Sequence, residues 1–231
     1  MKKLSLIFFC IVLSYASFGQ GALSKIPGNF YVDFGLTFWE DDSGLPLESQ
    51  SRSISISYMY EFSLSPSGQF TFNPGLGYTG ENLFFKSGMT LTHAGDQTIA
   101  TPTNNLYDNT KKSKLVGNYF DVPVEFRFRT YPGRNAFRFA LGAKVGVLMG
   151  GHTKVKYEDN GETRIAKDKG EFNLNRFKAS LVGRIGYGWI NFFCTYGLTN
   201  TFQDNTLVDT NGNLINVKDR PITVGITISN F

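Results

Sequence analysis

The sequence predicts an all-β fold, an antiparallel up-and-down arrangement of eight long strands, on three observations. Apolar and polar residues alternate with period two along most of the chain, as in strands whose two faces meet different surroundings. Gly (25 residues) and Phe (22 residues) are abundant, and charged residues make up only 18% of the chain, against roughly a quarter in soluble domains. No apolar run reaches the roughly 18 residues that a membrane-spanning helix requires.

Residues 1–19 have the composition of a secretory signal peptide. Two lysines precede an apolar stretch at 4–13, and Ser17 and Gly19 are the small residues expected before a cleavage site. We therefore assign the mature domain to residues 20–231. Removal of this leader lowers the formal net charge of +4 by two, and the remaining balance is too weak to indicate a nucleic-acid partner.

Eight runs of alternating residues account for the predicted strands. They cover residues 29–39, 53–62, 69–80, 117–130, 135–150, 174–187, 190–202 and 218–230. On the first four strands, in order, the apolar face carries Phe30, Val32, Phe34, Leu36 and Phe38; Ile54, Ile56, Tyr58, Tyr60 and Phe62; Phe70, Phe72, Leu76 and Tyr78; and Phe120, Val122, Val124, Phe126 and Phe128. On the last four it carries Phe137, Phe139, Leu141, Ala143, Val145 and Val147; Phe177, Ala179, Leu181 and Ile185; Ile190, Phe192, Cys194, Tyr196 and Leu198; and Ile222, Val224, Ile226 and Ile228. Most runs exceed the usual globular strand and suffice for the roughly 9–11 residues that a tilted strand needs to cross a bilayer.

The connections between these strands alternate in length. The short ones are 63–68, 131–134 and 188–189, and the long ones are 40–50, 81–116, 151–173 and 203–217. This rhythm is typical of transmembrane β-barrels of outer membranes, in which short periplasmic turns oppose long external loops. Because the strand number is even, both termini are expected on the periplasmic side.

The charges on the polar face decide which face meets lipid. An arginine at mid-depth on the lipid face costs about 2–4 kcal/mol, so the strand that carries Arg127 and Arg129 must turn them inward. An eight-stranded barrel has interior room mainly for side chains, and we predict a lumen closed by ion pairs rather than an open channel. The acidic members are Asp33, Glu61, Asp121 and Glu125, and the basic members are Arg127, Arg129, Arg138, Lys144, Arg176, Lys178 and Arg184.

A soluble barrel of the lipocalin kind is the alternative fold, with its apolar face pointing inward and its charges outward. Strand length, the near-absence of lysine and glutamate at apolar positions, and the loop rhythm favour the membrane barrel.

Aromatic residues at the strand ends predict girdles at the two membrane interfaces. We place Trp39 and Phe202 at the long-loop interface, and Phe62, Tyr131 and Trp189 at the short-turn interface. The alternative interpretation is that these aromatic residues reflect only the general enrichment of aromatic residues in β-strands.

Two prolines fall in the middle of neighbouring predicted strands. Pro74 and Pro123 each remove one hydrogen-bond donor from the sheet, and a closed barrel has no edge strand to hold them. We therefore predict a β-bulge at each proline. A weak seam for a partner or a lipid is the functional alternative.

Three motifs carry a resemblance to a known family. Residues 118–125 (Asn-Tyr-Phe-Asp-Val-Pro-Val-Glu) resemble the Tyr-x-Glu-Ile-Pro-Leu strand of the Bacteroidota outer-membrane beta-barrel domain family, the PorT-like group, with Asp and Val in place of the usual Glu and Ile. Residues 140–146 resemble its next, Gly-rich strand, and Tyr-Gly-Leu-Thr-Asn at 196–200 is similar to the end of its seventh strand. A last strand that ends in Phe231 completes the resemblance. The resemblance covers residues 20–231 and implies an integral outer-membrane protein without assigning one activity.

Candidate chemistry is sparse, and we predict no catalytic, cofactor or metal site. A lipid-A-modifying hydrolase would need a Ser–His–acid set at the outer rim, for which His93 and His152 are the available histidines. No Gly-x-Ser-x-Gly element accompanies them, so solvated loop histidines are the preferred interpretation.

Two loop clusters have both a functional and a bland interpretation. Asp204, Asp209, Asn211 and Asn213 could offer oxygen ligands to calcium, but their spacing favours a turn. A basic run at Lys111, Lys112 and Lys114 could contact lipopolysaccharide phosphates, although a solvated loop base is the simpler interpretation.

The sequence therefore predicts a non-enzymatic outer-membrane barrel that acts structurally or through its long loops, in a partner-binding or secretion-related role. The expected partners are outer-membrane lipid and lipopolysaccharide, with a protein partner at the loops as a further possibility. A lipid-A-modifying hydrolase and a small-solute pore are the alternatives.

Overall fold

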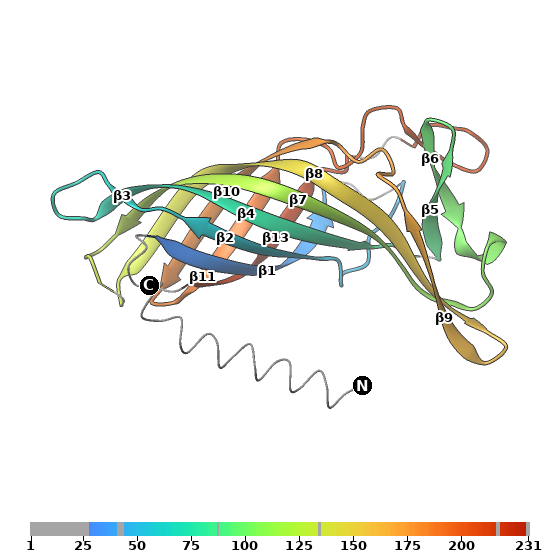
Figure 1. Ribbon diagram of the computed structural model, residues 1–231, viewed down its shortest axis with the longest axis horizontal. Coiled ribbons are helices and arrows are strands. Elements are labelled where there is room, and N and C mark those ends of the chain that lie inside the picture. Colours follow the sequence, from blue (N-terminus) through green and yellow to red (C-terminus); the bar gives the residue numbers. More distant parts are fainter. Residues whose placement is uncertain (1–27, 41–43, 87, 134, 216–217, 230–231) are drawn as a thin grey trace.

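The computed structural model describes residues 28–40, 44–86, 88–133, 135–215 and 218–229, and these form an almost entirely β structure (Figure 1). Antiparallel strands pair in chain order, and the pairings of β8 with β10 and of β13 with β1 close them into a ring of eight. The ring consists of β1 (Asn29–Trp39), β2 (Arg52–Met59), β4 (Phe70–Phe84), β7 (Thr110–Arg129), β8 (Phe137–Asp159), β10 (Phe177–Tyr187), β11 (Ile190–Gly197) and β13 (Pro221–Ser229). The predicted eight-stranded up-and-down barrel is confirmed. The proposed signal peptide and Phe231 lie outside the described residues.

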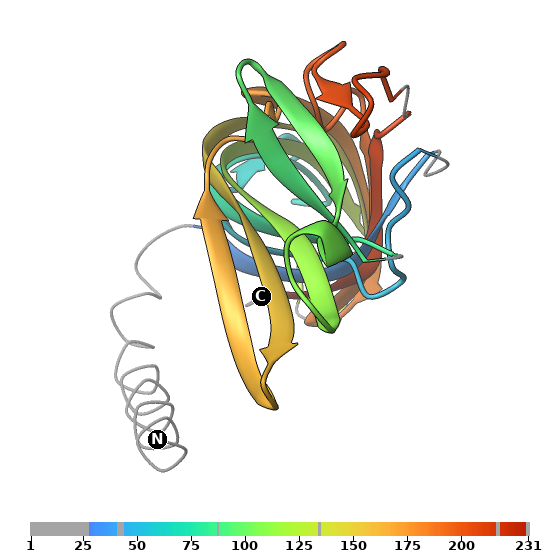
Figure 2. The ribbon, with the colours of Figure 1, turned by 90° about the vertical axis from the view of Figure 1, so that its right-hand side faces the viewer.

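Shorter elements lie at the two ends of the barrel. They are β3 (Phe62–Ser63), β5 (Met89–Ala94), β6 (Gln97–Pro102), the 3₁₀-helix η1 (Thr103–Asn105), β9 (Glu162–Lys169) and β12 (Leu207–Val208). β5, β6 and β12 form a separate three-stranded sheet. Figures 1 and 2 show this sheet and β9 at one end of the barrel, and Figure 1 shows β3 at the other. Within the described residues, no helix has the length and apolarity to cross a membrane.

The long connections are more ordered than the sequence predicted. β7 begins at Thr110 and β8 continues to Asp159, well beyond the predicted bounds of 117 and 150. β8 then turns into β9 at Asn160 and Gly161, whose φ angles of 50° and 80° suit an Asn-Gly hairpin turn. The strand extensions were missed because they carry lysines on the face where the barrel strands carry apolar residues. In contrast, β10 begins at Phe177 and β11 ends at Gly197, both inside their predicted ranges.

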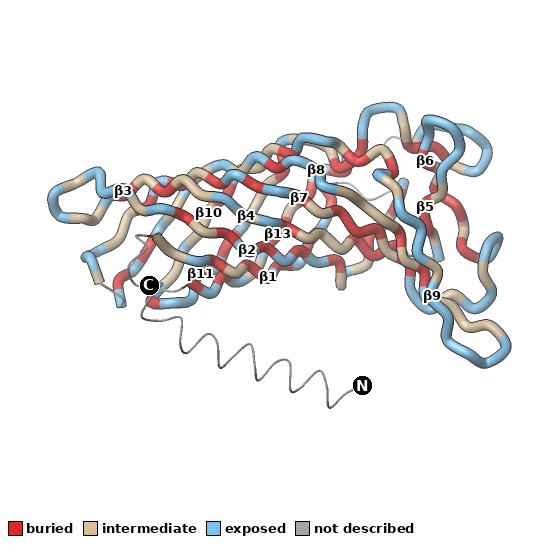
Figure 3. The backbone as a smooth tube through the Cα atoms, viewed as in Figure 1, coloured by how far each residue is buried: buried red, intermediate tan, exposed pale blue. Residues whose placement is uncertain are grey.

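Burial alternates along the ring strands (Figure 3), and most of the buried residues of these strands are polar or charged. Phe126 is 58% exposed, whereas its neighbour Arg127 is 7% exposed. The same holds on β1, where Asp33 is buried and Phe34 is exposed. This arrangement excludes the lipocalin-like alternative, because a soluble barrel would bury the phenylalanines and expose the arginine.

The predicted bulges at the prolines are wrong. Pro74 stands opposite Val124, and the pairing of β4 with β7 resumes at Gly77 opposite Asp121 in the same register. Pro123 is paired with β8 without a shift. The two prolines lie at nearly the same level on the adjacent strands β4 and β7. Each lacks a backbone N–H donor, and both fall at one short interruption of the β4–β7 hydrogen bonds. The Pro74 carbonyl still accepts a hydrogen bond from the Tyr60 amide (2.9 Å).

Candidate functional site

The centre of the lumen is occupied by one buried network of ionised side chains. The two Glu125 oxygens accept hydrogen bonds from Arg127 Nη2 and Arg184 Nε, each at 2.9 Å. Arg184 also binds Asp33 through both ends of its guanidinium, at 2.7 and 2.9 Å, and donates to Thr227. Glu125 is 0% exposed. The strands β1, β7, β10 and β13 are therefore joined across the barrel interior by charge-assisted hydrogen bonds.

Aromatic rings complete this central layer. The Arg127 guanidinium lies 4.3 Å from the Tyr31 ring centroid and donates a hydrogen bond to the Tyr31 hydroxyl. The Arg184 guanidinium lies 5.4 Å from the Phe193 ring centroid. Both contacts stabilise a desolvated cation. The period-two pattern of residues 29–39 puts Tyr31 on the same face as Asp33, but its role was not predicted, because the predicted lumen set contained charged residues alone.

Two further ion pairs fill the lumen toward the long-loop end. Lys144 Nζ lies 3.5 Å from Asp121 Oδ2, and Thr79 hydrogen-bonds to both residues. Above them, Lys178 Nζ lies 2.6 Å from Glu81 Oε2. Sequence reasoning missed Glu81, because it assigned that residue to a loop, whereas β4 continues to Phe84.

The arginines at the short-turn end bind the turns themselves. Arg129 pairs with Glu61 at 2.9 Å and donates to the Gly68 carbonyl at 2.7 Å. Arg138 donates to the carbonyl oxygens of Gly133 and Gly188, so it ties two turns together. These two arginines thus close the lower end of the lumen by holding turn carbonyls.

Arg176 does not join the lumen network. β10 begins one residue after it, at Phe177, and the Arg176 side chain is exposed. The prediction that Arg176 faces the interior is wrong, because the strand pattern was extended too far toward the loop.

Two cavities that lie beside the ion pairs of the lumen are small. They measure about 20 and 30 Å³, and their linings include Asp121 and Lys144. Since a cavity needs about 10–15 Å³ of such volume to hold one water, each has room for only about two waters. The ion pairs themselves, rather than a column of water, fill this part of the barrel.

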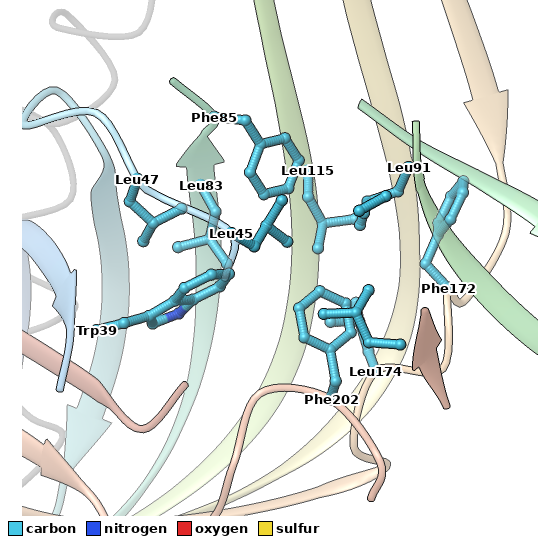
Figure 4. Packing of buried hydrophobic residues seen from close by; sticks show 12 residues of the cluster. Trp39, Leu45, Leu47, Leu83, Phe85, Leu91, Leu115, Phe172, Leu174 and Phe202 are labelled. Atoms are coloured by element: carbon cyan, nitrogen blue, oxygen red, sulfur yellow. The ribbon is translucent and has the colours of Figure 1, made fainter. Parts of the chain in front are cut away.

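A hydrophobic cluster covers the long-loop end of the barrel (Figure 4). We call it the loop cap, and it consists of Trp39, Leu45, Leu47, Leu83, Phe85, Leu91, Ala100, Leu115, Phe172, Leu174, Phe202 and Leu207. Each of the four long connections contributes at least one of these residues. The loops therefore fold onto one another as a small core above the ion pairs.

The loop cap corrects the predicted aromatic girdle at this end. Trp39 is only 6% exposed, and its ring packs edge-on against Phe202 with centroids 6.1 Å apart. Both residues are core rather than interface, because Trp39 continues the inward-facing series of β1. Tyr131 and Trp189, at the short-turn end, are 48% and 60% exposed.

The two histidines occupy different surroundings. His93 stacks on Phe172, with ring centroids 4.3 Å apart. His152 lies opposite Lys169 on β9, and its pKa is lowered by burial and by four nearby lysines. A catalytic histidine of a hydrolase is oriented by a carboxylate, whereas the charges that act on His152 are positive.

The acidic loop cluster forms a turn. Asp209 Oδ1 accepts hydrogen bonds from the amides of Asn211 and Asn213, each at 2.8 Å, and Oδ2 accepts one from the Asn213 side chain. These hydrogen bonds hold the Asp209 pKa below its usual value. Asp204 instead accepts from Asn200 at 3.3 Å. The carboxylates therefore serve the turn, as the bland interpretation predicted.

A solved structure and a family model are similar to this chain. Among solved structures, the chain is similar to the crystal structure of Ail, the attachment invasion locus protein of Yersinia pestis, with 11% identity and a TM-score of 0.33 over 89% of this chain and 100% of Ail. Comparison with curated protein sequences gave no match. A family model described as outer membrane protein beta-barrel domain matches residues 29–203, from the start of β1 to beyond β11. The PorT-like subgroup stays a prediction. This chain belongs to the outer membrane protein beta-barrel domain family and is an integral outer-membrane protein.

Proposed function

We propose that this protein is a non-enzymatic, non-conducting barrel that acts through the folded surface of its long loops, as a structural element or as a docking site for a partner. One observation carries the proposal: a hydrophobic core built from all four long connections covers a lumen already filled by ion pairs. A porin-type barrel would instead hold a water-filled channel in its interior.

The loops are tied to one another by polar contacts as well as by the loop cap. Thr98 on β6 donates to the Asn173 side chain at 2.7 Å, and its amide donates to the Thr206 carbonyl at 2.9 Å. These bonds join three different connections. A surface ordered in advance loses less conformational entropy when it binds a partner, which supports recognition as the role of this end.

The first expected result is the absence of steady conductance. Purified protein inserted into planar bilayers at neutral pH should give no stable single-channel steps, because the filled cross-section leaves no continuous water path. Insertion should be verified by heat-dependent electrophoretic mobility of protein recovered from the same lipid.

Two outcomes would contradict the proposal. Reproducible unitary currents would support the small-solute pore. A change in lipid A mass on expression, which disappears in the His152→Ala variant, would support the hydrolase instead.

The second expected result concerns orientation. We place the short turns and both termini in the periplasm and the loop cap outside. The Ser229 amide donates a hydrogen bond to the carbonyl of Trp189, in a short turn, at 3.0 Å. The end of β13 therefore lies on the same side of the barrel as the short turns. In a Cys194→Ser background, Asn160→Cys should react with a membrane-impermeant maleimide on intact cells. The matched variant Ser67→Cys, in the β3–β4 turn, should react only after the outer membrane is permeabilised. The reverse pattern would invert the orientation.

A further inference from the structure

A second charged surface lies outside the lumen, on the strand extensions at the long-loop end. Lys114 on β7 stands opposite Lys154 on β8, and Lys154 stands opposite Lys167 on β9. The next row pairs His152 with Lys169. We call these five side chains the basic face. Directly opposite residues on one face of an antiparallel pair lie about 5 Å apart, and like charges at this spacing destabilise the sheet.

A β-bulge turns this face outward. The pairing of β7 with β8 changes register between Asn118 and Tyr119. Below the shift, even-numbered residues of β8 such as Lys144 point into the lumen. Above it, Thr153 and Val155 are buried, at 3% exposure each, so the even-numbered Lys154 points outward. The shift therefore places the lysines of the β8 extension on the outer surface. In the lumen, by contrast, Lys144 of the same strand pairs with a carboxylate.

The cations of the basic face have no acidic counterpart among the described residues. No ion pair there joins Lys114, Lys154, Lys167 or Lys169 to a carboxylate, in contrast to the lysines of the lumen. Lys114 donates a hydrogen bond to the Asn82 side chain and lies 5.3 Å from the centroid of the Phe84 ring, and both of these groups are uncharged.

The surrounding potential is strongly positive. The pKa of Lys114 is lowered by burial and by Lys154, Arg52 and Lys167. Two nearby carboxylates are engaged by other cations: Glu158 pairs with Lys111 at 2.8 Å, and Asp159 pairs with Arg164 at 3.0 Å. Asp168 on β9 stands opposite Thr153, so its side chain is on the other face of the strand from Lys167 and Lys169. An external anion would remove the repulsion that the fold leaves in place.

The position of the basic face identifies the kind of anion. The exposed apolar side chains of the ring strands form a belt around the barrel, which we call the apolar band. On β8, Met149 is 66% exposed at the upper edge of this band, and His152 and Lys154 follow three and five residues later. At about 3.3 Å per residue along a tilted strand, this places them roughly 10–17 Å along the strand from the band. Polar head groups occupy the zone just beyond the hydrocarbon layer. Lys154 and the lysines paired with it in the basic face thus lie directly above the surface that contacts acyl chains.

We propose that the basic face binds the phosphate groups of a lipopolysaccharide molecule in the outer leaflet, whose acyl chains lie against the apolar band below. The β8–β9 hairpin, which projects beyond the barrel wall (Figure 2), supplies most of the cations. A lipid that carries phosphates above its acyl chains matches both parts of this surface at once. The proposal rests on the orientation proposed above, which the cysteine-labelling experiment tests separately.

The test is binding of purified full-length protein, in detergent, to lipopolysaccharide. A triple variant, Lys114→Gln with Lys154→Gln and Lys167→Gln, should weaken the affinity at least about tenfold, since each cation near a phosphate surface contributes on the order of 1 kcal/mol. A charge-matched control, Lys111→Gln with Arg164→Gln and Lys218→Gln, should bind as the wild type does. Dephosphorylated lipopolysaccharide should bind the wild type as weakly as intact lipopolysaccharide binds the triple variant.

Each other result would overturn the proposal. Equal affinity of wild type and triple variant, with both folded by heat-dependent mobility, would show that the basic face is not used. Inorganic phosphate or poly-L-glutamate bound as tightly as lipopolysaccharide would show that the occupant is a free anion or an acidic protein rather than a lipid.

Discussion

Replacement of Glu125 by alanine is expected to destabilise the barrel by about 3–5 kcal/mol, the usual cost of removing one partner from a buried ion pair. Glu125 is 0% exposed and is shared by Arg127 and Arg184. Without it, the Arg127 guanidinium keeps two uncharged hydrogen-bond acceptors, the Tyr31 hydroxyl and the Met59 sulfur. The free energy of unfolding should be measured by urea titration of protein reconstituted in lipid vesicles.

Glu61→Ala provides the matched control for this prediction. Glu61 also pairs with one arginine at 2.9 Å, but its side chain is 23% exposed and Arg129 keeps the Gly68 carbonyl as an acceptor. Its loss should cost about 1 kcal/mol or less, as for other solvent-accessible pairs. Equal losses in the two variants would mean that water screens the central network, and the description of a filled lumen would then be wrong.

Replacement of Phe172 by alanine is expected to open the loop cap while the barrel stays folded. Phe172 is 0% exposed, stacks on His93, and holds a φ angle of 48° that a bulky residue rarely adopts. Truncation of a buried phenylalanine costs about 3–5 kcal/mol. In hydrogen–deuterium exchange, the amides of β5 and β6 should lose protection by roughly a hundredfold or more, since 1.4 kcal/mol corresponds to tenfold.

The barrel strands and an exposed residue of the same loops serve as controls. Amides paired between β4 and β7 below Gly80 should exchange at the wild-type rate, because their ladder lies outside the loop cap. Leu106→Ala, at a residue 46% exposed beside η1, should change neither set of amides. Loss of protection throughout the barrel would show that the loops and the barrel unfold as one unit.

Alternation, read together with the rhythm of the loops and the cost of placing charges in lipid, was enough to predict the barrel and the direction of its faces. It works on β1, β4 and β10 because each successive side chain must meet either hydrocarbon or a filled interior, and the two surroundings select opposite residues. The same rule placed Asp33, Glu125 and Arg184 inside. Which acid meets which base did not follow, since Arg184 reaches Asp33 across 151 positions of sequence and only the curvature of the closed ring brings them together.

The alternation rule fails where the outside of the barrel is no longer apolar or the inside is no longer polar. Above the apolar band, the outer face of the strands meets water and head groups, so the extensions of β7 and β8 carry lysines there. Without an apolar face, these extensions were predicted to be loops. Inside the loop cap, the inner face becomes apolar, so Trp39 is core although it looked like an interface residue.

The sequence by itself therefore determined the fold class, the number and order of the membrane-crossing strands, and the division of charged from apolar faces, because these depend on local alternation. Only the tertiary structure decided the ion-pair partners, the gathering of four loops into one core, and the outward turn of Lys154. Those features arise from ring closure and from the register shift near Asn118, which involve residues far apart in the chain and leave no periodic trace in it.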